Sequence, residues 1–481
     1  MSSALAPQQP PQVLPSRDDP VVLAASEVVG GPAGRRARPG RSWWTPVRVL
    51  LVLTFLAAGL GVLAKEHCRA AAWSRPDPDQ YVHQCYSDIP LLYSGRGLDQ
   101  GVVPYVDDVP EEQAIEYPVL TGAVMGVTAA LVPGAAEGGE RARWYFDLNV
   151  LLLAVAAAVT VVATARTVPW RPWDAALVAL APGTILAGTI NWDLHAVALT
   201  ALALLAWARR RPGWAGVALG LATAAKFYPV LLLGPLLLLA LRTGRWRAAG
   251  LAVLTAAGAW LAVNVPVMLL NAENWSLFYR FSSDRPAGFG SIWYALQLRG
   301  LGVPPAALNA AWQALFAACC LGIAVLALAA PRRPRLASLA FLTVAAFVLT
   351  TKVYSPQYVV WLVPLAALAR PRWRDFLIWQ ACEVVHFFGT WLYLVGLVSQ
   401  EQANRALSAQ AYVVAVVVHV VGTLWLAGVV IRDILRPAHD PVRADGSDDP
   451  TGGEFDAAPD ALRLAGARRE RTGQPRPALE S

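Results

Sequence analysis

Ionisable side chains at the margins of apolar segments are the residues of this sequence that could do chemistry. Lys352 lies within TKVYSPQYVVWLVP (351–364), where one apolar stretch ends and the next begins, and Lys226 opens KFYP at a similar boundary. Asp88 opens DIPLLYSGRG, where a carboxylate would meet the membrane surface. An unpaired charge in a membrane costs roughly 2.5 to 3.5 kcal/mol even on insertion scales, so such residues are functional candidates.

The composition is that of an integral membrane protein. Of 481 residues, 56% are hydrophobic and only 15% are charged, against about 25% charged in soluble domains. The mean hydropathy is +0.43. Apolar stretches recur from Val47 to Ile431 without the alternation of an outer-membrane barrel, so the spans should be α-helices. The sequence therefore predicts an all-α polytopic membrane protein and excludes water-soluble enzyme folds.

The net charge of +7 is explained by membrane topology and does not indicate a nucleic-acid partner. The arginines cluster in short loops beside apolar segments, where cytoplasmic loops usually carry them. GRRARPGR precedes the first span and places the N-terminus in the cytoplasm. Six later clusters are candidate cytoplasmic loops: 165–173, 208–214, 242–247, 331–335, 370–374 and 432–437. All six share the cytoplasmic side only if the segment 117–134 does not cross the bilayer.

The segment 117–134 is interrupted by two prolines and two glycines, which suits an interfacial helix better than a span. We therefore assign it to a large first extracytoplasmic loop, 65–144, that carries juxtamembrane helices. About twelve spans remain, centred within 47–64, 145–164, 174–190, 194–207, 214–225, 229–241, 248–270, 305–330, 336–350, 357–369, 375–397 and 410–431. The pair 214–225 and 229–241 is too short to cross as ideal helices and suggests a broken hairpin.

Three regions follow from this topology. Residues 1–46 are predicted to be a disordered cytoplasmic tail, 47–434 the membrane domain, and 435–481 a second disordered cytoplasmic tail. The five cysteines form no CxxC pair and no zinc spacing, which argues against a cysteine metal or redox site. Cys68 and Cys85 share the first loop, and the sequence leaves open whether they form a disulfide.

Under the same topology the polar motifs gather on the extracytoplasmic side. They are the first loop, NWDLHA (191–196), KFYP (226–229), NAENWSLFYRFSSDRP (271–286) and KVYSPQY (352–358). The chain thus separates its chemically active side chains from its arginine loops.

These motifs resemble glycosyltransferase family 87, the actinobacterial membrane enzymes of the GT-C class. The resemblance covers roughly Val47 to Ile431 and rests on SDIPLLYSGRGLDQGVVPY with EYPVLTG, INWDLHAVAL, ATAAKFYPVLLLGPLLL and TKVYSPQYVVWLVP, in that order. The excess of alanine, arginine and proline also fits an actinobacterial source. The resemblance implies a GT-C bundle in the plasma membrane. It also implies transfer of a hexose from a polyprenyl-phosphate sugar to an extracytoplasmic glycolipid or glycan, with inversion. Mannose is the leading candidate for this hexose.

In such enzymes an acidic residue early in the first loop serves as general base, and Asp88 matches that position. The donor phosphate needs fixed positive charge, which Lys226 and Lys352 would supply with Arg96 or Arg280. Pro356 would break the helix and free the neighbouring side chains for the headgroup or sugar. The further substrate-binding candidates are Tyr354, Ser355, Gln357, His195, Asp193, Tyr228 and Glu116. Neither a metal nor a cofactor is expected, since lysine can do the charge work.

Each assignment has a structural alternative. Asp88 and Asp193 could be helix N-caps. The two lysines could simply extend to the membrane–water interface, where their charges are hydrated. His195 could satisfy a local hydrogen bond. Glu383 and His386 share a helix face, and the sequence gives them no role. A transporter or lipid flippase is the alternative function. It should show two similar halves and mid-membrane polar residues, whereas this chain shows no repeat and its polar residues lie at one face.

Overall fold

The computed structural model describes residues 44–136, 138–444 and 446–464, and its regular elements are all helical. Six of the described helices are long and apolar enough to cross a membrane. They are α2 (Pro46–Leu63), α7 (Gly139–Thr167), α13 (Trp246–Leu270), α16 (Pro305–Ala329), α19 (Trp373–Val398) and α20 (Ala409–Leu435). The predicted class, an all-α polytopic membrane protein, is confirmed.

Five shorter helices of 11 to 16 residues fall on further predicted spans. They are α10 (Asp193–Ala208), α11 (Pro212–Ala225), α12 (Leu233–Thr243), α17 (Leu336–Thr350) and α18 (Val359–Ala369). The remaining predicted span, 174–190, differs: it consists of η2 (Pro172–Ala175), α8 (Ala176–Ala179) and α9 (Pro182–Ala187). Pro182 interrupts it, because proline removes a helical hydrogen bond and clashes with the preceding turn. The number of crossings stays a prediction.

The first loop carries juxtamembrane helices, as predicted: α3 (Glu66–Ala70), α4 (Asp79–Val82), α5 (Asp88–Gly95), η1 (Leu98–Gln100) and α6 (Val119–Ala130). Helix α6 has 12 residues and would extend about 18 Å, well short of a bilayer core of about 30 Å. Gly122 of α6 lies under the Tyr105 ring, where a Cβ would come within 2.1 Å of the tyrosine hydroxyl oxygen. This close contact fastens α6 to the loop that precedes it.

Between α13 and α16 the polar segment forms α14 (Ala272–Asp284) and α15 (Ile292–Leu298). The side chain of Asn271 caps α14 by accepting a hydrogen bond from the Asn274 amide (3.0 Å). The Ser291 hydroxyl caps α15 in the same way through the Tyr294 amide (3.2 Å). These caps satisfy backbone donors that a helix start leaves unpaired.

Helices α11 and α13 pack backbone to backbone. A Cβ on Gly216 would lie 2.1 Å from the Ala252 carbonyl oxygen, and one on Gly220 would lie 2.2 Å from that of Ala256. These two glycines form a GxxxG pattern, which allows close helix approach in membranes. The contact fixes the position of the α11 C-terminus, where Lys226 follows.

The prediction of a disordered C-terminal tail is wrong for residues 436–444 and 446–464, which pack against the arginine loops; residues 445 and 465–481 lie outside the described residues. Asp440 forms an ion pair with buried Arg335 (Oδ2 to Nε, 2.7 Å), and buried Asp449 accepts a hydrogen bond from the Leu336 amide (2.8 Å). In η7 (Gly453–Phe455) Phe455 is fully buried. The sequence suggested solvated charges because it does not show that these aspartates meet arginines far away in the chain. Four short elements complete the described chain: η3 (Tyr228–Leu232), η4 (Pro356–Tyr358), η5 (Ala403–Arg405) and η6 (Pro437–His439).

Replacement of Asp440 with asparagine should lower the thermal unfolding temperature of the detergent-solubilised protein by several degrees. The substitution leaves the Arg335 guanidinium buried without its anionic partner, a loss that typically costs about 3 to 5 kcal/mol. Glu454→Gln, a partly exposed charge change in the same segment, is the matched control. Equal unfolding temperatures for the two variants would show that the C-terminal segment contributes no stability through this ion pair.

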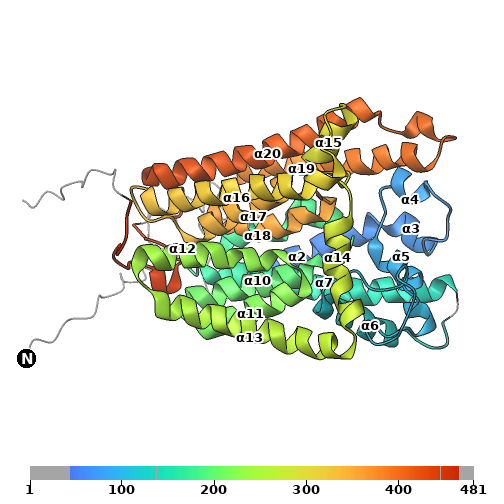
Figure 1. The fold of residues 1–481 in the computed structure, drawn as a ribbon, viewed down its shortest axis with the longest axis horizontal. Coiled ribbons are helices and arrows are strands. Elements are labelled where there is room, and N and C mark those ends of the chain that lie inside the picture. Colours follow the sequence, from blue (N-terminus) through green and yellow to red (C-terminus); the bar gives the residue numbers. More distant parts are fainter. Residues whose placement is uncertain (1–43, 137, 445, 465–481) are drawn as a thin grey trace, which may run out of the picture. The chain divides into compact units, whose positions relative to one another are not determined.

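The chain places its two polar regions at opposite ends of the helices. In Figure 1 the first-loop helices α3 to α6 lie at one end, and the C-terminal segment with the α12 end lies at the other. The arginine loops join that second end through pairs such as Arg242 with Asp460 (2.8 Å). This separation agrees with the predicted sorting of the motifs, while the side of the membrane that each end faces stays a prediction.

Candidate active site

A cavity of about 870 Å³ lies where the first loop, α14 and the KVYSPQY segment meet. All of its lining residues belong to the compact unit formed by residues 50–481. Predicted site residues that line it are Asp88, Glu116, Lys226, Tyr228, Lys352, Tyr354, Ser355 and Gln357. Candidates from four separate stretches of the sequence thus share one space, and their chemical roles stay predictions.

Asp88 begins α5 but does not cap it. The N-cap is Ser87, whose hydroxyl accepts from the Ile89 amide (3.3 Å) and donates to the Thr189 carbonyl (2.8 Å). The Asp88 carboxylate is therefore free to face the cavity, where it accepts hydrogen bonds from two tyrosine hydroxyls. Tyr86 donates to Oδ1 at 2.6 Å and Tyr117 donates to Oδ2 at 3.3 Å.

Burial raises the pKa of Asp88 above its ordinary value, although the tyrosine hydrogen bonds and the charge of Lys226 oppose the shift. The segment before it is held by Lys65, whose Nζ donates to the Tyr86 carbonyl (2.9 Å). Burial lowers the pKa of Lys65 to about 7, while the Asp88 charge opposes that change. A carboxylate with a raised pKa is a stronger base, which suits proton abstraction.

If Asp88 is the base, activity should fall on acidification with a midpoint above about 4, the ordinary range of an aspartate. The active form is deprotonated, so a raised pKa moves the acidic limb of the profile toward neutral pH. Tyr86→Phe removes a hydrogen bond that favours the carboxylate and should move the limb further up. The measurement is kcat/KM against pH for both proteins. A shift of the limb to lower pH in Tyr86→Phe would contradict the assignment.

Lys226 follows the last residue of α11 in an extended conformation, and its Nζ lies 2.7 Å from Oδ1 of Asp193. Asp193 is buried on α10 and also accepts a hydrogen bond from Trp361 Nε1 (2.9 Å). It does not line the cavity, and contact between Asp193 and sugar or phosphate stays a prediction. Burial tends to lower the pKa of Lys226, because it disfavours the charged ammonium group. Asp193 and the neighbouring acidic groups outweigh this effect and raise the pKa. Asp193 thus positions a cation.

Lys352 lies beyond the end of α17, and its Nζ donates to the Ser283 carbonyl (2.6 Å) at the end of α14. Arg285 follows closely and lines the same cavity. Burial and then the Arg285 charge lower the pKa of Lys352. The sequence proposed Arg280 in this role, but Arg280 does not line the cavity and donates to the Glu273 carbonyl (3.2 Å). Two cations from separate segments therefore face one space.

Helix α17 already ends at Thr350, and Pro356 is the first residue of η4 (Pro356–Tyr358), so it begins the next helical segment instead of breaking a helix as predicted. Tyr354 just before it lines the cavity, yet its hydroxyl donates to Oε2 of buried Glu383 (2.7 Å). Glu383 also lies 3.3 Å from Nδ1 of His419. Glu383, for which the sequence gave no role, therefore holds Tyr354 in place. The Tyr354 ring, rather than its hydroxyl, is what remains for substrate.

Family comparison identifies the chain. The model of glycosyltransferase family 87 matches residues 116–351, which include Lys226 and end one residue before Lys352. Over this range, just under half of its length, the chain matches glycosyltransferase family 87. No curated protein matches the sequence significantly. Among solved structures, ArnT from Cupriavidus metallidurans bound to undecaprenyl phosphate is similar at 16% identity, with a TM-score of 0.41 over 83% of this chain and 78% of that one.

The family 87 match indicates a membrane glycosyltransferase, and the remaining candidates can be placed around the cavity. Glu116 lines the cavity, but its carboxylate is engaged by Arg96 through two hydrogen bonds of 2.8 and 2.6 Å. Arg96 and His195 do not line the cavity, and their contact with substrate stays a prediction. The Arg96–Glu116 pair instead joins the end of α5 to the residues before α6.

The cavity also has aromatic walls, and sequence reasoning missed four of their residues: Tyr86, Tyr358, Trp361 and Trp391. Trp361 stacks between Tyr228 (ring centroids 4.6 Å apart) and Tyr358 (3.9 Å). On another wall Tyr86 lies 4.8 Å from Trp391 between ring centroids. The signals existed, since Tyr86 precedes Asp88 by two residues and Tyr358 closes KVYSPQY. What the sequence lacked was the pairing of these rings across distant segments.

Proposed function

We propose that this protein transfers a hexose from a polyprenyl-phosphate sugar to a hydroxyl of an extracytoplasmic glycolipid or glycan. Mannose is the leading candidate for the hexose. The transfer inverts the configuration at the anomeric carbon. The observation that carries the proposal is the meeting of Asp88 with Lys226, Lys352 and Arg285 around one cavity of about 870 Å³. That volume falls within the range of about 300 to 1,000 Å³ common for ligand pockets. A base and a group of cations are what this reaction requires.

In the reaction, the acceptor oxygen forms a bond to the anomeric carbon while its proton passes to the Asp88 carboxylate. The bond from the anomeric carbon to the phosphate oxygen breaks, and its electron pair stays on the phosphate. Lys352 and Arg285 stabilise the charge that develops there, and Lys226 adds positive potential between Asp88 and Asp193. A single displacement of this kind inverts the configuration.

Apolar residues at the cavity support a lipid-linked donor. Phe281, Phe289, Leu397 and Val398 line it with exposed side chains, so an isoprenoid chain could pack there while its phosphate meets the cations. The Cys68–Cys85 disulfide of the first loop supports an extracytoplasmic cavity, because disulfides persist in oxidising compartments. The arginine loops lie at the opposite end, which agrees with the positive-inside rule.

The test is transfer by purified protein in nanodiscs, with polyprenyl-phosphate [³H]mannose as donor and deletion-strain membranes as the source of acceptor. The proposal expects tritium to enter an acceptor product covalently with the wild-type protein only. A fluorescent polyprenyl-phosphate probe, assayed for movement between leaflets, tests the alternative. Movement of the probe without any covalent transfer would favour a flippase and overturn the proposal.

Replacing Arg285 with glutamine should raise the KM for the lipid-linked donor by about 10- to 150-fold, with a smaller effect on acceptor KM. This range corresponds to the loss of one hydrogen bond to a charged group, about 1.5 to 3 kcal/mol. Arg280→Gln, a change of the same charge on α14 outside the cavity, is the matched control and should match the wild type. Equal donor KM values for both variants would remove Arg285 from the phosphate site.

A further inference from the structure

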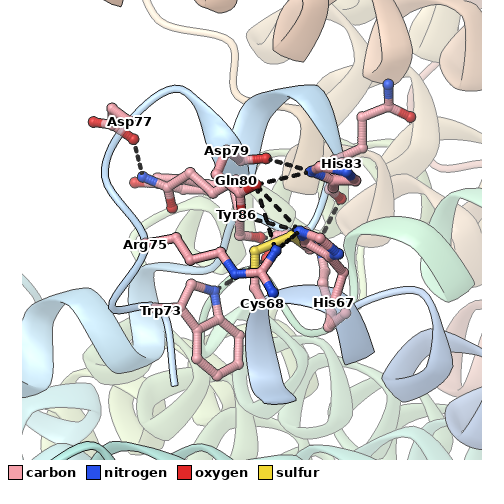
Figure 2. Close-up of a disulfide and its surroundings, with 12 residues drawn as sticks. His67, Cys68, Trp73, Arg75, Asp77, Asp79, Gln80, His83 and Tyr86 are labelled. Atoms are coloured by element: carbon pink, nitrogen blue, oxygen red, sulfur yellow. Dashed lines mark hydrogen bonds and ion pairs between the residues drawn. A yellow bond between two sulfur atoms is a disulfide. The ribbon is translucent and has the colours of Figure 1, made fainter. Parts of the chain in front are cut away.

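A cluster of two histidines and an aspartate lies in the first loop, outside the cavity. Asp79 Oδ2 is 3.0 Å from Nε2 of His67, and Asp79 Oδ1 is 3.3 Å from Nδ1 of His83. One ligand atom from each residue lies within 4.8 Å of the other two. Figure 2 shows the three side chains turned toward one another.

Local covalent and helical constraints hold these residues together. Asp79 and His83 are four residues apart at α4, so their side chains share one helix face. His67 is on α3 beside Cys68, and the Cys68–Cys85 disulfide joins α3 to the chain just after His83. The two imidazole rings stack with centroids 3.5 Å apart. The cluster is therefore assembled before any ligand arrives.

We propose that His67, Asp79 and His83 bind one divalent transition-metal ion, with water completing the coordination. Zinc is the leading candidate. Imidazole nitrogen and carboxylate oxygen bind zinc at about 2.0 to 2.2 Å, which places tetrahedral ligand atoms about 3.3 to 3.6 Å apart. Asp79 Oδ1 by itself lies 3.2 Å from Nε2 of His67 and 3.3 Å from Nδ1 of His83, which is close to that spacing. Small adjustments of side chains that are 21 to 40% exposed would complete the site.

Arg75 is the competitor for this site. Its Nη1 lies 2.8 Å from Nε2 of His67 and 3.8 Å from Oδ1 of Asp79, where it partly neutralises the carboxylate. Its side chain is 51% exposed, so it can turn into solvent when an ion arrives. The alternative is an ion-pair network without a metal function. The two possibilities predict opposite effects of removing Arg75, because a competitor's loss strengthens metal binding.

The metal would have a structural role, because none of the three ligands lines the cavity. It would fasten α3 to α4 on the segment that continues to Tyr86, the donor to Asp88. Helix α4 also carries Tyr81, whose ring stacks near Trp391 at 6.0 Å on the cavity wall. The inference does not depend on the proposed function, since it concerns binding and stability alone.

The test is zinc titration by calorimetry of the full-length protein in detergent, after tag removal and chelator treatment, with the Cys68–Cys85 disulfide verified by mass spectrometry. We expect one zinc per chain and a higher unfolding temperature with zinc. His67→Ala and His83→Ala should each weaken binding by at least about 100-fold, as expected for loss of one of three ligands. Arg75→Ala should strengthen it.

His439→Ala is the control histidine, since His439 is exposed in η6 and should bind zinc as the wild type does. Absence of stoichiometric zinc binding by the wild-type protein would overturn the proposal, whatever the variants do. So would wild-type affinity in both His67→Ala and His83→Ala, or weaker binding in Arg75→Ala. Size-exclusion profiles matching the wild type would establish that the variants are folded.

Discussion

Replacement of Asp88 with asparagine is expected to reduce kcat for sugar transfer by about 10²- to 10⁴-fold, the usual contribution of a general base. Asparagine keeps the shape of the side chain and one oxygen that can accept from Tyr86, while its amide nitrogen can donate to the Tyr117 hydroxyl oxygen, so folding should be preserved. What it lacks is the ability to take the acceptor proton. The measurement is single-turnover transfer from the lipid-linked donor, with the unfolding temperature as the folding check.

Asp108→Asn is the matched control for this substitution. Asp108 lies in the same loop and is exposed, and it does not line the cavity. Wild-type activity in Asp108→Asn with loss in Asp88→Asn would support the assignment. Full activity in Asp88→Asn would move the base elsewhere.

The second large effect is expected at Lys226. Lys226→Met leaves Asp193 buried at 3% exposure without its cation, and breaking a buried pair in this way costs about 3 to 5 kcal/mol. Transfer should also fall sharply, because positive potential beside the donor phosphate is lost. Thermal unfolding and transfer are both measured for the single variant.

The double variant Asp193→Asn with Lys226→Met separates the two effects. It removes both charges, and the asparagine oxygen can still accept from Trp361 Nε1, so most of the lost unfolding temperature should return. Transfer should remain low, because the cation is still missing. Recovery of both stability and transfer would show that Lys226 acts only as a structural partner of Asp193.

The candidate site was partly accessible from the sequence. Asp88, Lys226 and Lys352 were chosen because charge at an apolar margin is costly, and this argument needs only local composition. The same argument could not choose between Arg280 and Arg285, five residues apart, because only the turn after α14 decides which one faces the cavity. It also treated Asp193 as a ligand, although its oxygens are occupied by Lys226 and Trp361.

The sequence by itself determined the fold class, because long apolar runs must be helical where backbone groups have no water partners. It also determined the helical margins at which the chemically active side chains lie. Only the tertiary structure decided which of those side chains meet. Asp88 and Lys352 are far apart in the chain yet line one cavity, and Arg335 and Asp440 form a buried pair that ordered a segment expected to be a free tail. The hydrophobic pattern indicates which residues are buried. It does not show which side chains distant in the sequence contact one another, because that depends on how the helices pack.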